Sequence, residues 1–126
     1  MNNKTFLQYH LIFVTKYRKK ILDERISTKI KTIIEELCIK NRWDLIAIEV
    51  GESDHIHIML RLEPKYSISK VVQILKQMTR YYVWQDFPSL RKHYWKKDLL
   101  WSNGYFCSTT GEASAETIRK YIESQG

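Results

Sequence analysis

The chain has 126 residues, of which 44% are hydrophobic and 28% charged, and this composition excludes an intrinsically disordered protein. Its formal net charge of +7 favours a polyanionic partner, most simply nucleic acid. A chain of this length is expected to form one domain, over residues 1–126. No apolar run approaches the roughly 20 residues of a membrane span, and the first residues lack a signal-peptide pattern, so we expect the protein in the cytoplasm and away from membranes.

The first predicted element is a strand over residues 8–16, which is apolar on both faces, as central strands are. A basic cluster with one tyrosine follows at the strand's end and comprises Lys16, Tyr17, Arg18, Lys19 and Lys20. Such a cluster could bind phosphates through its cations and stack a base on the tyrosine. A solvated surface loop is an equally good interpretation.

An amphipathic helix is predicted over residues 23–41, with Asp23 as its N-cap. Its apolar stripe is Ile26, Ile30, Ile33, Ile34 and Leu37. The two cysteines, Cys38 and Cys107, show no Cys-x-x-Cys spacing, so we expect small core residues in a reducing compartment and no disulfide framework.

A hairpin of two strands is predicted next, with a tight turn at residues 51–54. One face of its first strand carries Ile46, Ile48 and Val50, and one face of its second carries Ile56, Ile58, Leu60 and Leu62. His55 and His57 lie together on the opposite face of the second strand, about 7 Å apart at Cα. Neutral imidazole is a common ligand of divalent cations. Two ligands alone do not define a site, and hydrogen-bonded histidines on a half-buried strand are the alternative.

A second long helix is predicted over residues 67–86, with Ser67 as its N-cap and Phe87-Pro88 as its end. Its buried stripe is Ile68, Val71, Val72, Leu75, Met78 and Tyr82. Residues 89–97 then interleave basic side chains with aromatic ones, a pattern that suits single-stranded nucleic acid. Trp95 and Trp101 could equally be core anchors.

The last predicted elements are a short strand over residues 104–109, a turn at 110–112 and a helix from Ser114 to about Gln125. One face of this helix carries Ile118, Tyr121, Ile122 and Gln125. Tyr121 and Gln125 are therefore one turn apart.

The order β-α-β-β-α-β predicts an α+β, ferredoxin-like (RRM-like) fold, followed here by the C-terminal helix that carries the tyrosine. In this fold the first and third strands are central in an antiparallel sheet, and two long helices cover one face. His55 and His57 are then expected to point to the open face.

A tyrosine hydroxyl is a poor nucleophile at its ordinary pKa of about 10, so it needs a metal that polarises the phosphate or a positioned base. Gln125 could supply an oxygen to such a metal. Together with His55 and His57 it would make a three-ligand N/O site that accommodates Mg²⁺ or Mn²⁺.

The His55-Ile56-His57 strand resembles the His-hydrophobic-His signature of HUH nucleases. More specifically, an ordered set of segments resembles the TnpA family, the single-tyrosine transposases of insertion sequences that move as single-stranded DNA. The segments that carry this resemblance are residues 9–18, 55–57, 64–70, 101–106 and 117–123.

The resemblance implies that Tyr121 attacks a DNA phosphodiester, leaving a 5′-phosphotyrosine and a free 3′-OH, and that His55, His57 and Gln125 hold the metal. It also implies a homodimer whose active sites can be completed in trans, and DNA with hairpins at the element's ends as the partner. Charge alone selects the candidate DNA contacts Lys16, Arg18, Lys19, Arg91, Lys92, Lys96 and Lys97.

Three alternatives remain open. A non-catalytic module that binds single-stranded nucleic acid would share the fold, since RNA-recognition domains have the same element order. A related enzyme recruited by the host is the second, either a repeat-associated tyrosine transposase or a replication-initiating nickase. The third is an interaction domain with incidental histidines, which leaves the Tyr121/Gln125 face unexplained.

Overall fold

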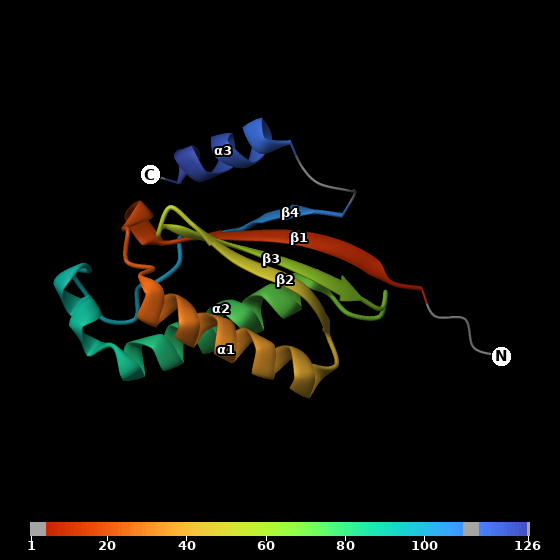
Figure 1. Cartoon of the computed structure of the whole chain (residues 1–126), viewed down its shortest axis with the longest axis horizontal. Coiled ribbons are helices and arrows are strands. Elements are labelled where there is room, and N and C mark those ends of the chain that lie inside the picture. Colours follow the sequence, from red (N-terminus) through yellow and green to blue (C-terminus); the bar gives the residue numbers. More distant parts are fainter. Residues whose placement is uncertain (1–4, 110–113, 126) are drawn as a thin grey trace.

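The computed structural model describes residues 5–109 and 114–125, and these form a four-stranded antiparallel sheet with helices on both faces. The helices and strands, in chain order, are β1 (Leu7–Val14), η1 (Lys16–Arg18), α1 (Glu24–Asn41), β2 (Asp44–Gly51), β3 (His55–Leu62), α2 (Ile68–Asp86), η2 (Pro88–Lys92), β4 (Phe106–Ser108) and α3 (Ala115–Ser124). The strand order β2-β3-β1-β4 makes the first and third strands central. In Figure 1, α1 and α2 cover one face and α3 lies over the other. The predicted α+β, ferredoxin-like fold with an additional C-terminal helix is confirmed.

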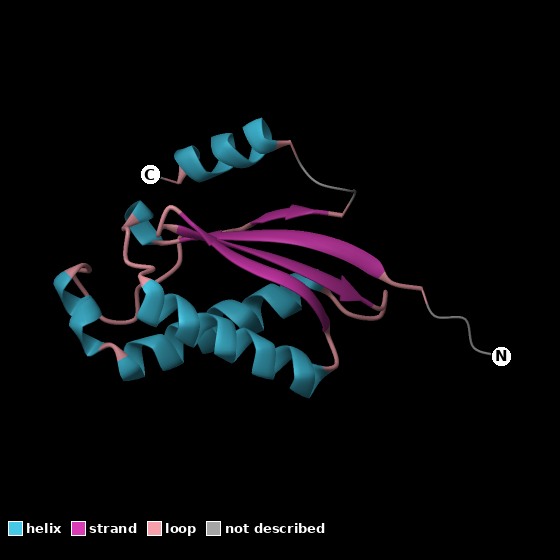
Figure 2. Cartoon of the chain, in the orientation of Figure 1, coloured by secondary structure: helices cyan, strands magenta, loops and turns pink. Residues whose placement is uncertain are grey.

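Helices lie on both faces of the sheet (Figure 2), and the two faces bury two separate groups of side chains. On the α1/α2 face, the β3 residues Ile56, Ile58, Leu60 and Leu62 are buried in the main core, as predicted. β1 contributes to both faces, because Leu11 and Phe13 enter the main core while Ile12 and Val14 pack under α3. This double burial explains why the sequence of β1 is apolar on both faces.

Both long helices begin at the predicted caps. The side chain of Asp23 accepts a hydrogen bond from the Ile26 amide at 2.9 Å, and Ser67 caps α2 in the same way. The predicted stripe of α2 is wrong at its C-terminal end, where Tyr82 is 37% exposed and Thr79 and Val83 are buried instead. The reason is periodicity: positions four residues apart share a face, and the row that starts at Leu75 continues through Thr79 and Val83.

The prediction for β2 is wrong at one position. A β-bulge shifts the register between Leu45 and Ala47, so Ile46 is 44% exposed and Leu45 packs against the core instead. One extra residue in a strand reverses the facing of every side chain before it, and apolar alternation alone does not reveal the bulge.

Cys38 is buried, and burial raises the pKa of its thiol to about 12. Cys107 is half-buried against the core, and Trp101 is a core anchor whose indole Nε1 donates to Thr79 Oγ1 at 2.9 Å. Trp95 is 67% exposed, so the core interpretation is wrong for it. The turn predicted at residues 110–112 lies outside the described residues. Within the described part of the chain, no helix has the length and hydrophobicity to cross a membrane.

Candidate active site

His55 and His57 lie together on the face of β3 opposite the main core, as its alternation predicts. This face was expected to be open, but α3 lies over it, because the apolar face of α3 packs on β1. The imidazole rings open into two neighbouring cavities beneath α3. A cavity of about 320 Å³ is lined by His57 and His10, and one of about 440 Å³ by His55 and Arg18. Ala115 and Ile118 of α3 line both cavities, so this helix is the common roof over the histidine pair.

The His55 ring is held on two sides. Its Nδ1 lies 2.8 Å from Oδ1 of Asp54, and this carboxylate is fully buried at the end of the β2–β3 turn. Across the hairpin, Gly51 is the register partner of His55, and a Cβ added to Gly51 would overlap the imidazole Nε2. The ring therefore occupies the space that any larger residue at position 51 would fill.

His57 has a different neighbour. Its Nε2 lies 3.3 Å from Nδ1 of His10, which is 2% exposed, and the ring centroids are 5.5 Å apart. One of the two nitrogens donates and the other accepts, so the tautomers of the two rings are linked. His10 lies on β1, within the strand predicted over residues 8–16. The antiparallel register, in which Ile12 pairs with His57, is what brings the two rings together.

Tyr121 lies on α3 over β1 and β4. Its ring packs on Phe106 with centroids 5.6 Å apart, beside the cluster of Ile12, Val14 and Ile122. The hydroxyl is buried and has no hydrogen-bond partner within residues 5–109 and 114–125. This burial raises the pKa of Tyr121, because the phenolate would lose hydration. The structure brings Tyr121 to the histidine face, but its hydroxyl makes no hydrogen bond to either imidazole.

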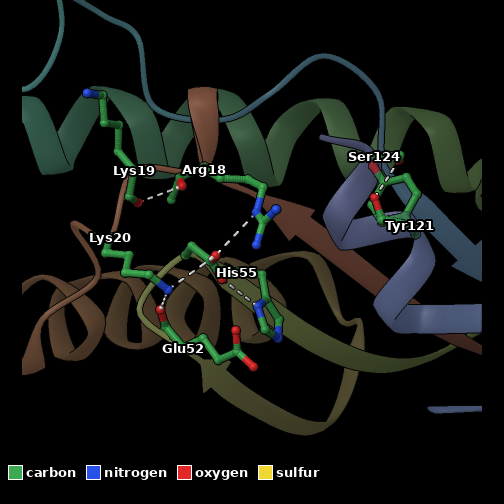
Figure 3. Close-up of polar contacts among 9 residues, drawn as sticks. Arg18, Lys19, Lys20, Glu52, His55, Tyr121 and Ser124 are labelled. Carbon is green, nitrogen blue, oxygen red and sulfur yellow. Dashed lines mark hydrogen bonds and ion pairs between the residues drawn. The ribbon is translucent and has the colours of Figure 1, made fainter. Parts of the chain in front are cut away.

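Gln125 caps the C-terminus of α3, and its side-chain Nε2 donates to Ser124 Oγ at 3.0 Å. Ser124 Oγ in turn donates to the Tyr121 carbonyl oxygen at 2.6 Å (Figure 3). The side-chain contact of Gln125 among the described residues is therefore at the end of its own helix, and Gln125 lines neither histidine cavity. Among the described residues, no three His, Cys, Asp or Glu side chains are grouped as metal ligands.

The two basic segments identified in the sequence meet in space. The exposed indole of Trp95 donates from Nε1 to the hydroxyl of Tyr17 at 3.1 Å, and the Tyr94 hydroxyl donates to the Lys16 carbonyl at 3.2 Å. The lysines Lys16 and Lys96 lie within 5.4 Å of the Tyr17 and Trp95 ring centres, respectively. We call this the basic–aromatic surface, made of Lys16, Tyr17, Trp95 and Lys96. Of the other predicted DNA contacts, Lys19, Arg91, Lys92 and Lys97 are exposed.

Arg18 is not simply a solvated side chain of the basic loop. Its Nε lies 3.6 Å from Asp54 Oδ2 (Figure 3). Its side chain also lines the His55 cavity. The Lys20 ammonium lies 3.8 Å from the same carboxylate oxygen and donates to the Glu52 carbonyl at 3.2 Å (Figure 3). The loop that follows β1 is thus turned toward the histidine strand.

A ferredoxin-like sheet with two histidines on one strand, beneath a helix that carries a tyrosine, has the arrangement of a single-tyrosine DNA transposase. The chain belongs to the IS200-like transposase family, whose model matches residues 3–125. It is 33% identical over 119 residues to the ISDra2 transposase TnpA of Deinococcus radiodurans, covering 94% of this chain and 84% of that one. It is 30% identical over 120 residues to the transposase for insertion sequence element IS200 of Salmonella typhimurium, covering 94% and 76%.

One solved structure supports this assignment, and a second shares the fold. A crystal structure of a protein from Deinococcus radiodurans R1 classed as a transposase has a TM-score of 0.88 at 31% identity, covering 99% of this chain and 95% of that chain. The structure of a REP-associated tyrosine transposase bound to a REP hairpin has a TM-score of 0.63 at 11% identity, covering 98% and 67%. At that identity the second likeness shows the fold alone.

Proposed function

We propose that this transposase cleaves and rejoins single-stranded DNA at the ends of its insertion sequence, with Tyr121 as the nucleophile. The phenolic oxygen attacks the phosphorus, the bond to the 3′ oxygen breaks, and the products are a 5′-phosphotyrosine and a free 3′-OH. A second 3′-OH then attacks the phosphotyrosine and restores Tyr121. No water or nucleotide is consumed, because the covalent intermediate conserves the phosphodiester. The position of α3 over the His55/His57 face is the observation that carries this proposal.

The donors in this region fit a hard or borderline divalent cation, since they combine two imidazoles with an amide oxygen. His55 and His57, with Gln125, would hold Mg²⁺ or Mn²⁺. When bound, the ion supplies charge that polarises the scissile phosphate. Because the Gln125 amide donates to Ser124 at its own helix end and lines neither histidine cavity, we expect the end of α3 to shift when the ligand set is completed.

The same shift of α3 is needed for Tyr121 to act as the nucleophile. The Tyr121 hydroxyl is buried beside Phe106, where burial raises its pKa and keeps it protonated at neutral pH. A phenol in this position is shielded from reaction. We infer that α3 leaves this position for catalysis and docks against a histidine pair, its own or that of a second copy in a homodimer.

The positive charge and the exposed aromatic rings support single-stranded DNA as the partner. The basic–aromatic surface offers cations for phosphates and exposed rings for unpaired bases, and the chain carries a net charge of +7. Hairpins at the ends of the element are the substrates we expect. The predicted contacts Arg18, Lys19, Arg91, Lys92 and Lys97 would extend the cationic region around it.

The test is a covalent-adduct assay. Wild-type protein incubated with labelled single-stranded DNA carrying an end hairpin and Mn²⁺ should give a species that survives denaturation. Tyr121→Phe should abolish that species, a loss of at least 100-fold, while binding single-stranded DNA like the wild type, because it removes only one oxygen. Tyr82→Phe, at an exposed position of α2, is the matched control and should form adducts normally. Persistent adducts in Tyr121→Phe would remove Tyr121 from the proposed role.

The basic–aromatic surface also supports a second candidate, a module that binds single-stranded nucleic acid without cleaving it. The same assay separates the two. A wild-type protein that binds the DNA tightly but yields no covalent species with either metal would favour the binding module.

A further inference from the structure

Asp54 is a buried acidic side chain that the proposed reaction does not use. The residue is 0% exposed and directly precedes His55, whose Nδ1 lies 2.8 Å from the carboxylate Oδ1. A carboxylate oxygen only accepts hydrogen bonds, so the proton of this bond belongs to the imidazole Nδ1. The neutral ring then keeps its free lone pair on Nε2, which is the form of a histidine that binds a metal through Nε2.

The carboxylate is fixed by its surroundings. The main-chain carbonyl of Asp54 accepts from the Thr15 amide at 2.9 Å, and its amide donates to the Gly51 carbonyl at 3.2 Å. The two residues before it, Glu52 and Ser53, have left-handed φ values of 50° and 60°, which form the tight turn into β3. Both the turn and the loop after β1 therefore hold the position of this carboxylate.

Two cations face the oxygen that His55 does not use. Arg18 Nε lies 3.6 Å and Lys20 Nζ 3.8 Å from Oδ2. A buried carboxylate is costly unless it is paired, and these two ion pairs supply the opposite charge, while Oδ2 has no hydrogen-bond partner among the described residues. The arrangement leaves Oδ1 for the imidazole and Oδ2 for the basic loop.

We propose that Asp54 is a positioning residue: it holds the His55 imidazole in the Nδ1–H tautomer and so leaves Nε2 as the metal-binding atom. This inference rests on the proposed role of His55 as a metal ligand. A purely structural role, in which Asp54 only ties the loop of Arg18 and Lys20 to the hairpin, makes a different prediction: it would leave metal affinity and the tautomer unchanged as long as the fold is intact.

The first measurement is Mn²⁺ affinity of the free protein, by titration with electron paramagnetic resonance detection. Asp54→Asn keeps the shape of the side chain but loses the charge, and it should weaken binding by about 10- to 100-fold, as removal of a ligand's hydrogen-bond partner does elsewhere. His57→Ala marks the effect of losing a ligand. Asp44→Asn is the matched control and should bind like the wild type, because Asp44 is half-exposed at the other end of the hairpin and pairs with Arg61 at 3.7 Å.

The second measurement is the ¹⁵N chemical shifts of the His55 ring, which report the tautomer directly. Wild-type protein without metal should show a protonated Nδ1 and an unprotonated Nε2. Because this measurement uses only the wild type, it does not depend on whether a variant folds. In Asp54→Asn the preference should weaken, with circular dichroism confirming the fold.

Three results would overturn the proposal. A wild-type ring protonated at Nε2 would do so at once, as would Asp54→Asn binding Mn²⁺ as tightly as Asp44→Asn. Both leave Tyr121 chemistry standing, since adduct formation is measured separately. A wild-type protein that bound Mn²⁺ no better than His57→Ala would remove the metal role of the histidines together with this inference.

Discussion

Gly51 and His55 face each other across the β2–β3 hairpin, and the absence of a side chain on one is a condition for the ring of the other. His55 and His57 were predictable from alternation alone, because the period of a strand places them on one face. Asp54 and His10 were not, because their contacts depend on a turn with left-handed residues and on strand register. The clue available in the sequence was the position of Asp54, directly before the first histidine.

We predict that Gly51→Ala disables cleavage without unfolding the protein. Alanine is an ordinary residue in a strand, but its Cβ would overlap His55 Nε2 and force the imidazole to move. Covalent-adduct formation should fall by at least 10-fold, since misplaced catalytic groups cost this much or more. The measurement is the rate of adduct formation alongside thermal unfolding.

Gly104→Ala is the control and should have the opposite effect: it should lower stability but leave cleavage unchanged. Gly104 has a φ of +79° with open space around it, so alanine there strains the backbone and should cost about 1 kcal/mol of stability without touching His55. If Gly51→Ala cleaved at the wild-type rate, the His55 orientation would be irrelevant to the reaction.

At the level of elements, the sequence predicted the order, the caps and the central strands, because these follow from local periodicity and capping chemistry. It missed the bulge in β2 and the last turn of the α2 stripe, where tertiary packing decides which residue is buried. The sequence also did not predict where α3 packs, because the apolar face of a helix does not identify the surface that it contacts. The structure shows that α3 packs on Ile12 and Val14, a cluster separated from the main core by the sheet.

We predict that α3 can detach while the rest of the fold stays intact. Ile122 is the one residue of α3 that is buried, and Ile122→Ala should weaken docking by about 2 kcal/mol, at the low end for such changes because the cluster is small. A helix of 10 residues is not stable alone, so its amides should lose protection. Amide hydrogen exchange of α3 against that of α1 and α2 is the measurement.

The control for this prediction is Ile39→Ala, because Ile39 lies on α1 and is 79% exposed. It should leave the exchange of every helix unchanged. If Ile122→Ala instead lowered protection in α1 and α2 as much as in α3, the helix would unfold with the main core. The shift of α3 that the proposed reaction needs would then be too costly to occur in the folded protein.

Across the whole molecule, the basic side chains differ in their exposure to solvent. While Lys96 and Lys97 are exposed, Lys76 is partly buried in a cavity between α2 and the segment before β4. Its Nζ donates to the carbonyl oxygens of Ser102 at 2.8 Å and Gly104 at 2.7 Å, which ties α2 to that segment. Burial, and to a lesser extent the nearby charge of Lys16, lowers the pKa of Lys76 to about 8.

This shift predicts a stability that rises with pH in a defined window. The unfolded chain holds the Lys76 proton up to its ordinary pKa of 10.5, whereas the folded protein releases it near 8, so the unfolded state binds more protons between these values. The free energy of unfolding should therefore increase by about 1 kcal/mol from pH 7.5 to 9 on account of this group. Urea unfolding of wild type and Lys76→Met at both pH values measures it as the difference between the two increments. Equal increments in the two proteins would show that the ammonium is fully hydrated in the folded state.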